Sequence, residues 1–132
     1  MTSSLSHEKA AAWARSLYGD AVDRKDAAGF AAVFVEEGML HFGNEPAIIG
    51  RPQIENAIAR FFQAMVSLRH EFTAISCDGQ TIFLEALVTY RRHDDAIVTL
   101  PAMTVFQMAS TDDSFMAKEC RIYVDLKPLF AP

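Results

Sequence analysis

The first half of the chain repeats its apolar positions at helical spacing. Behind Ser6, a residue type that caps helices, apolar side chains recur every three or four positions. They are Trp13, Ala14, Leu17, Tyr18, Ala21 and Val22. This wide apolar stripe predicts a helix that packs on a sheet.

Two further helices are expected before residue 68. Asp26 suits the cap of a short helix that carries Phe30, Val33 and Phe34 and ends at Gly38. Met39 to Phe42 form a short apolar stretch, and a loop follows as far as Gly50. Pro52 suits the first turn of a third helix, whose apolar residues are the most regularly spaced in the chain: Ile54, Ala57, Ile58, Phe61, Phe62 and Met65.

The second half alternates apolar and polar positions with a period of two, as strands do. Four strands are predicted, at residues 68–77, 81–92, 96–108 and 115–126. Asp78-Gly79 is a strong hairpin signal, and residues 93–95 and 110–114 are the other connections. Pro101 falls inside the third strand, which predicts a bulge or an edge there. Three helices followed by an antiparallel meander indicate an α+β fold in one domain, residues 1–132.

Both faces of the strand at 81–92 carry apolar side chains. One face is wholly apolar, whereas the other mixes Phe83 and Leu87 with Glu85 and Thr89. A half-exposed antiparallel sheet is expected to show one polar face. We therefore expect the outer face to be covered by a second copy of the chain, which gives a homodimer.

Composition and charge exclude several classes of partner. The chain has 132 residues, 51% of them hydrophobic, and a net charge of -5 with no strongly basic patch. Nucleic acid is therefore not an expected partner. No run approaches the roughly 20 apolar residues that span a bilayer, and the N-terminus lacks an apolar signal stretch, so a cytoplasmic location is expected. The four His show no metal-ligand spacing and no glycine-rich loop follows a strand, so neither a metal nor a nucleotide cofactor is expected.

Three segments resemble the SnoaL-like branch of the nuclear transport factor 2-like superfamily. They are Asp26-Ala27-Ala28-Gly29-Phe30, Gly50-Arg51-Pro52-Gln53-Ile54 and Arg121-Ile122-Tyr123-Val124-Asp125-Leu126. The resemblance implies a cystatin-like cone, in which helices and a strongly curved sheet enclose one pocket. It also implies which face of the sheet lines that pocket. Members of the superfamily include both enzymes and non-catalytic modules, so the fold leaves function open.

The resemblance allows the catalytic positions of two members of this superfamily to be compared with the matching residues of this chain. Of the three residues used by ketosteroid isomerase, Tyr18 matches, whereas Phe42 and Thr104 stand where the family has aspartates. The acidic and basic set of limonene epoxide hydrolase falls on Leu87, Glu85 and Ile122. Neither chemistry is expected, and what the resemblance implies instead is a mostly apolar pocket wall: Leu40, Phe42, Phe61, Met65, Phe72, Leu87, Leu100, Ala102, Phe106, Ile122 and Val124.

A polar pair is nevertheless expected against that wall. If the hairpin closes at 78–79, Phe72 lies opposite Glu85 and His70 opposite Leu87. His70 and Glu85 then share one face as diagonal neighbours, within reach of each other. A carboxylate beside an imidazole fixes its tautomer and raises its basicity. The sequence thus predicts a His70–Glu85 dyad that moves a proton.

Tyr18 and Thr104 are the expected hydrogen-bond donors to a substrate oxygen, with Tyr18 counted among the catalytic residues. This predicts a cofactor-independent isomerase, lyase or cyclase that acts on a small hydrophobic, oxygen-bearing compound. Two alternatives stay open. The same residues could form a buried, satisfied pair in a module that only binds a ligand or dimerises, and a one-residue slip in register would turn both His70 and Glu85 outward.

Overall fold

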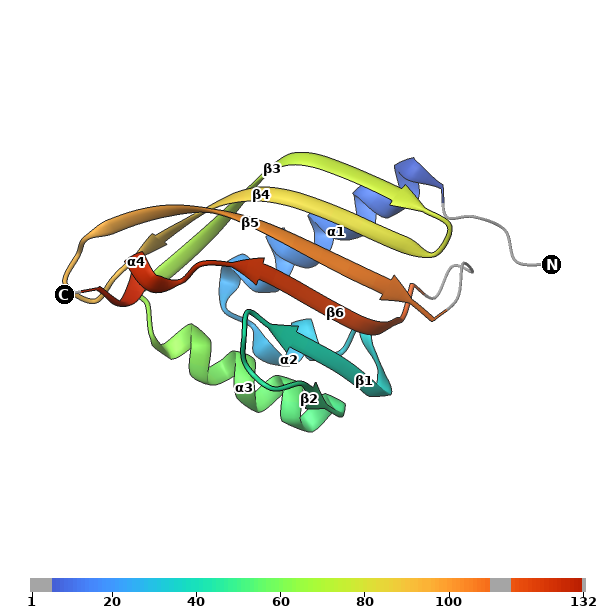
Figure 1. Cartoon of the computed structure of the whole chain (residues 1–132), viewed down its shortest axis with the longest axis horizontal. Helices are drawn as coiled ribbons and strands as arrows, with labels where there is room; N and C mark the ends of the chain where they lie inside the picture. Colours follow the sequence, from blue (N-terminus) through green and yellow to red (C-terminus); the bar gives the residue numbers. More distant parts are fainter. Residues whose placement is uncertain (1–5, 110–114, 132) are drawn as a thin grey trace.

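The computed structural model describes residues 6–109 and 115–131, in which helices lie on one side of a curved sheet (Figure 1). The elements follow in the order α1 (His7–Asp20), η1 (Val22–Arg24), α2 (Ala27–Ala31), β1 (Phe34–Phe42), β2 (Ile48–Ile49), α3 (Arg51–Gln63), β3 (Ser67–Asp78), β4 (Thr81–Arg91), β5 (Ile97–Met108), β6 (Ala117–Val124) and α4 (Lys127–Phe130). This is the predicted α+β class, with two short helical segments in addition to the three helices expected.

The strands form one mixed sheet in the order β2-β1-β6-β5-β4-β3. Among the described strands only the β1–β6 pair is parallel, and the other neighbours are antiparallel. Helix α1 packs against β3, and α3 packs against β1 and β2. Figure 1 shows the long strands β3, β4 and β5 bending around α1. The sheet is therefore concave toward the helices, as the cone of the resemblance requires.

The helix boundaries follow local chemistry. The Ser6 side chain accepts a hydrogen bond from the backbone N–H of Lys9, and Asp26 accepts one from the N–H of Gly29 at 3.0 Å. Both caps satisfy donors that a helix start leaves without an internal partner. Pro52 lies in the first turn of α3, where its missing N–H is harmless. These three predictions are confirmed.

The second helix is shorter than predicted. It ends at Ala31, and Phe34 already belongs to β1. Gly38 does not end a helix but lies within β1, where the pairing with β6 shifts register between Phe34 and Met39. A Cβ atom on Gly38 would lie 2.9 Å from the Phe34 side chain, so only glycine fits this close approach.

The irregularities of the sheet lie partly where the sequence placed them. No bulge occurs at Pro101 in its pairing with β4, but the pairing of β5 with β6 begins only at Ala102. At Pro101 the strand β5 is thus locally an edge, which accommodates a residue without an N–H. The connection expected at 110–114 lies outside the described residues. A bulge that the sequence did not predict occurs in β3, between Phe72 and Ala74.

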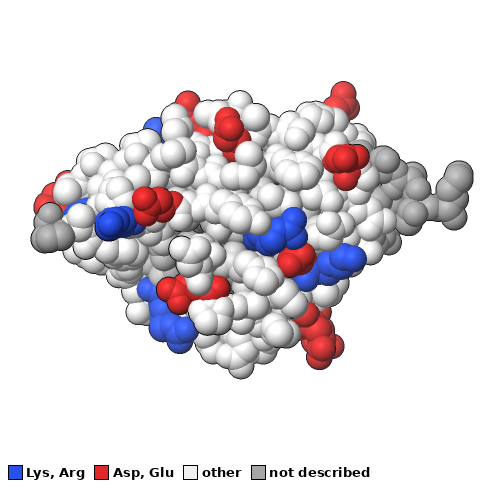
Figure 2. Space-filling model, viewed as in Figure 1, with Lys and Arg blue, Asp and Glu red and all other residues white. Residues whose placement is uncertain are grey.

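The core lies between the concave face of the sheet and the helices, as alternation and helical spacing require. Its largest fully buried side chains are Phe34, Phe106, Leu40, Ile54, Met65, Ile82, Leu84, Met108, Val88 and Cys120. On the opposite, outer face, Leu87 and Tyr123 are 40% and 55% exposed. Figure 2 shows wide uncharged areas on the side where the strands lie in front of α1.

Candidate functional site

One cavity opens between the concave face of the sheet and the helices. Its volume is about 40 Å³, and it is lined by Tyr18, Val22, Phe30, Phe42, Ile58, Phe61, Phe62, Leu68, His70, Val88, Tyr90, Ala102, Thr104, Ile122 and Val124. A water molecule needs roughly 10–15 Å³ of such space. The cavity as it stands therefore holds a few waters at most.

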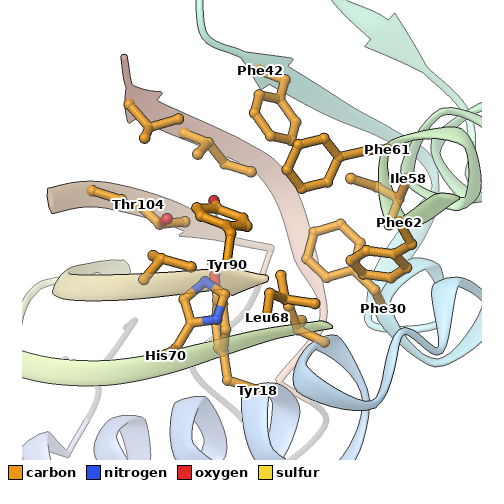
Figure 3. Close-up of a pocket in the computed structure, with 15 residues that line it drawn as sticks. Tyr18, Phe30, Phe42, Ile58, Phe61, Phe62, Leu68, His70, Tyr90 and Thr104 are labelled. Carbon is orange, nitrogen blue, oxygen red and sulfur yellow. The ribbon is translucent and has the colours of Figure 1, made fainter. Parts of the chain in front are cut away.

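The lining separates into two ends (Figure 3). Tyr18, His70, Tyr90 and Thr104 gather at one end, whereas the rings of Phe30, Phe42, Phe61 and Phe62 gather at the other. The first end supplies hydroxyls and an imidazole, and the second supplies only hydrocarbon.

His70 at the polar end is held by Asp23 of η1. The ring Nδ1 lies 2.7 Å from Asp23 Oδ1, and the backbone N–H of His70 donates to Asp23 Oδ2 at 3.0 Å. The two side chains are only 13% and 17% exposed. One carboxylate thus fixes both the main chain and the ring of His70, which leaves the imidazole little freedom to turn.

This contact assigns the tautomer of His70. A carboxylate only accepts hydrogen bonds, so Nδ1 carries the proton and Nε2 is left with its lone pair. No hydrogen bond from a described side chain to Nε2 is observed. Every fully buried side-chain nitrogen or oxygen of the described residues has a hydrogen-bond partner, so Nε2, which has none, is not fully buried. His70 lines the cavity, so its unbonded Nε2 is available to a molecule bound there. It is placed to accept a proton from a bound molecule.

Tyr18 packs on this imidazole from α1. Its ring centroid lies 4.6 Å from that of His70, and the ring also meets Phe72 edge-on at 5.2 Å. Burial raises the pKa of Tyr18 far above its usual range, whereas a side-chain hydrogen bond with Thr104 lowers it in part. Tyr18 consequently remains a neutral hydroxyl at any physiological pH.

Tyr90 of β4 is a second neutral hydroxyl at the polar end. Burial raises the pKa of Tyr90 to about 12, and the negative charge of Asp23 adds to the rise. Tyr90 is only 3% exposed. No described residue is seen to bond its hydroxyl, and Tyr90 lines the cavity, so this hydroxyl is available to a molecule bound there. An unpartnered donor beside a proton acceptor can hold a substrate oxygen.

Eight of the residues predicted for the site line the cavity. They are Tyr18, Phe42, Phe61, His70, Ala102, Thr104, Ile122 and Val124. Four others predicted for the wall point inward but lie outside the lining, in the packed core: Leu40, Met65, Leu100 and Phe106. Phe72 lies behind Tyr18 rather than in the cavity.

The predicted pair of His70 and Glu85 is wrong. Asp78 pairs with Thr81, and the bulge in β3 then sets Ala74 opposite Glu85 and His70 opposite Val88. Glu85 is exposed on the outer face, where its carboxylate accepts a hydrogen bond from Thr73 at 2.6 Å.

Leu87 was assigned to the wrong face as well. It pairs with Pro101, while the neighbouring pair of Ala86 and Ala102 points inward. The inward face of β4 is the wholly apolar one that ends at Tyr90. Alternation along β4 predicts that the wholly apolar face is the buried one. The resemblance instead implied that the face with Glu85 and Leu87 lines the cavity, and this implication is wrong.

Two polar residues of the site were missed from the sequence. Tyr90 ends the apolar face of β4, so assigning that face to the cavity would have predicted Tyr90 as a lining residue. Asp23 is 47 residues from His70 and lies in a short 3₁₀ turn. No local pattern connects the two, and only the packing of α1 and η1 on β3 brings them together.

The described residues offer neither a metal-binding cluster nor a membrane-spanning helix. They contain no three His, Cys, Asp or Glu side chains placed to hold a metal ion together. None of the helices in the described ranges has the length and apolar character needed to cross a bilayer.

A helix-covered, strongly curved α+β sheet of this kind defines the nuclear transport factor 2-like class. Within this class, the sequence profile of the SnoaL-like domain matches residues 14–114. The chain therefore belongs to the SnoaL-like domain family, as the resemblance predicted. No curated protein matches the chain in sequence.

Solved structures share the fold at low sequence identity. A protein described as a SnoaL-like polyketide cyclase from Jannaschia sp. is 18% identical, with a TM-score of 0.75 over 98% of this chain and 94% of that one. A protein with a ketosteroid isomerase-like fold from Catenulispora acidiphila is 17% identical, with a TM-score of 0.70 over 91% and 87%. An epoxide hydrolase of M. tuberculosis is 18% identical, with a TM-score of 0.70 over 94% and 88%. The chain thus has a fold that enzymes use.

Proposed function

We propose that this protein is an acid–base enzyme of the isomerase, lyase or cyclase type, which acts without a cofactor on a small hydrophobic, oxygen-bearing compound. The observation that carries the proposal is the Asp23–His70 contact of 2.7 Å at the polar end of a cavity whose other walls are apolar. The proton-transfer role first predicted for His70 is kept, with Asp23 in place of Glu85 as its partner.

The proposed reaction begins with proton abstraction by His70. Nε2 takes a proton from a carbon next to a carbonyl group, and the electrons of the broken C–H bond move to the carbonyl oxygen. Tyr90 and Tyr18 donate hydrogen bonds to this oxygen as it becomes negative. Asp23 stabilises the imidazolium that forms, because an opposite charge offsets the cost of a buried cation. Return of the proton to another atom is isomerisation, and loss of a neighbouring leaving group is elimination.

The substrate class follows from the lining. The cavity offers two tyrosine hydroxyls, one threonine hydroxyl and one imidazole, and its other walls are apolar. A compound that fits must place one oxygen at the polar end and bury hydrocarbon elsewhere, since a second polar group there would lose its hydration without a partner. Ketones and phenols are the simplest compounds of this kind.

Deuterium exchange tests the proposal without knowledge of the full reaction. Hydrophobic ketones that raise the melting temperature of the protein are incubated with it in D₂O, and deuterium at the carbon next to the carbonyl is followed by NMR. We expect the wild-type protein to catalyse this exchange and His70→Ala to abolish it. The matched control is His7→Ala, because His7 is exposed at the start of α1.

The alternative is a module of the same fold that binds a small ligand without chemistry. The small volume of the cavity, about 40 Å³, favours this alternative. Ketones that bind but show no exchange above the rate in buffer would establish it. Exchange that survives in His70→Ala would assign the chemistry to another group.

A homodimer through the outer face of the sheet is the second part of the proposal. Leu87 pairs with Pro101 and Met103 pairs with Tyr123 across β4, β5 and β6, so these side chains form one apolar strip, in which Met103 is half-buried and the other three are exposed. Light scattering tests it: Leu87→Glu should convert a dimer to a monomer, whereas Phe130→Glu, which changes an exposed apolar residue of α4, should not. A wild-type protein that is monomeric at high concentration would overturn this part.

A further inference from the structure

The cavity is too small for the compounds that its chemistry suits. A cavity of roughly 150 Å³ accommodates a benzene-sized ring. The space of the cavity beside His70 is about 40 Å³. A ring can therefore bind at His70 only if part of the wall moves or if the site continues beyond its present boundary.

The boundary at the aromatic end is a pair of rings, Phe42 of β1 and Phe61 of α3. Their centroids lie 4.9 Å apart at an angle of 57° (Figure 3). Both rings are partly exposed, whereas Phe30 and Phe62 beside them are 3% and 4% exposed. Only the first pair has free space on its outer side, so only these two rings can swing away without disturbing the core.

An apolar groove shares this pair of rings with the cavity. Phe42 and Phe61 line it as well as the cavity, together with Pro46, Ala47, Ile48, Ala57 and Leu126, and its volume is about 480 Å³. The charged members of the groove, Glu45 and Arg60, are both exposed and have opposite signs. The groove therefore offers an apolar floor with no net charge.

We infer that cavity and groove are two compartments of one binding site, divided by the Phe42–Phe61 pair. The ligand is an elongated neutral compound: its oxygen-bearing head lies at His70, and an apolar chain passes between the two rings into the groove. The inference rests on the proposed function only for the placement of the head. It deepens that proposal, because it selects chain-bearing ketones and phenols over compact ones.

A homologous series of 4-n-alkylphenols, from methyl to heptyl, measures the second compartment by calorimetry. In the wild-type protein the affinity should rise roughly three- to fourfold with each added methylene, as burial of a CH₂ group predicts. Ala57→Phe fills the floor of the groove and should flatten this slope. Asn56→Phe adds the same side chain at an exposed neighbouring position of α3 that lies outside the groove, and it should keep the slope.

Phe61→Ala tests the division itself. Removing the ring joins the two compartments, so 2-naphthol, a compact bicyclic phenol, should bind at least tenfold more tightly than it binds the wild-type protein. A wild-type affinity that does not depend on chain length, or equal slopes in Ala57→Phe and Asn56→Phe, would overturn the inference. These binding measurements involve no turnover. A flat series with intact deuterium exchange would reject the groove alone, and a steep series without exchange would reject the catalytic proposal alone.

Discussion

The two ends of the cavity are built by different forces. At the polar end, directional hydrogen bonds fix the groups: both oxygens of Asp23 hold His70, and Tyr18 packs on the same imidazole. At the aromatic end, contacts between rings position the side chains, and those contacts have no single preferred geometry. The polar end is therefore fixed, as a base that must be oriented toward its substrate requires. The aromatic end is adaptable, because its rings can adjust to the shape of a ligand.

This contrast has a physical basis in what each contact resists. A charge-assisted hydrogen bond weakens steeply when its angle changes, so it holds an imidazole in one orientation. A partly exposed phenyl ring loses little when it rotates, because water or ligand replaces the surface it leaves. A general base needs the first property, and a wall that must admit a ligand needs the second.

Removal of the charge on Asp23 should have the largest effect on the fixed end. In Asp23→Asn the amide NH₂ can donate to Nδ1, which moves the imidazole proton to Nε2 and blocks it as a base. We expect the exchange rate to fall about 10²–10⁴-fold, the usual contribution of a positioned base. Asp20→Asn is the control, since Asp20 accepts a hydrogen bond from Ser16 on the surface of α1. Equal rates in the two variants would show that Asp23 does not orient the base.

Replacing single phenylalanines of the aromatic end by alanine should distinguish rings that stabilise the fold from rings that can move, because the loss in free energy of unfolding should differ. Phe62 is 4% exposed, and Phe62→Ala should lower the free energy of unfolding by about 3–5 kcal/mol. The partly exposed Phe61 buries less surface, so Phe61→Ala should cost about 1–2 kcal/mol. Urea denaturation measures both values. Losses of equal size would contradict the view that Phe61 is the movable ring.

Much of this arrangement was predictable from alternation along the strands. Alternation in the predicted strands that became β5 and β6 is regular, and the residues that the resemblance placed on their pocket face, among them Thr104 and Ile122, do line the cavity, as does Phe42 of β1, for which no strand was predicted. Alternation fails where a strand is irregular, because one extra residue turns all later side chains to the other face. The bulge at Thr73 in β3 has no distinctive sequence signal, so the pairing partner of Glu85 was not predictable.

The missing partner of His70 shows a second limit. Asp23 reaches the imidazole from η1, across 47 residues of sequence. Its position depends on Lys25, which follows η1 with a left-handed backbone. The ammonium group of Lys25 lies 2.9 Å from the carbonyl oxygen of Met65, and this contact connects the turn to the segment after α3. Such long-range contacts follow from tertiary packing, which periodicity does not encode.

The buried hydroxyl of Tyr90 should make the polar end sensitive to alkali. Its pKa is about 12 in the folded protein, against about 10 for an unfolded tyrosine. The folded state therefore keeps the proton longer, and the stabilisation is complete below pH 10 and is lost as the pH rises through about 12. Between these values the free energy of unfolding should fall about 1.4 kcal/mol per pH unit more steeply in the wild type than in Tyr90→Phe. Urea denaturation at pH 9, 10 and 11 measures the slopes, with Tyr123→Phe, an exposed tyrosine, as the control.

Glu85 provides the smallest expected effect and separates the two candidate dyads. Its carboxylate lies on the outer face and accepts a hydrogen bond from Thr73, so it contacts neither His70 nor the cavity. Glu85→Gln keeps an oxygen that can accept the same hydrogen bond, and exposed substitutions of this kind change stability by no more than about 0.5 kcal/mol. The exchange rate, measured beside that of Asp23→Asn, should equal that of the wild type. A loss in Glu85→Gln as large as that in Asp23→Asn would mean that β3 and β4 pair in the register that the hairpin alone predicts, and the cavity face of both strands would have to be assigned anew.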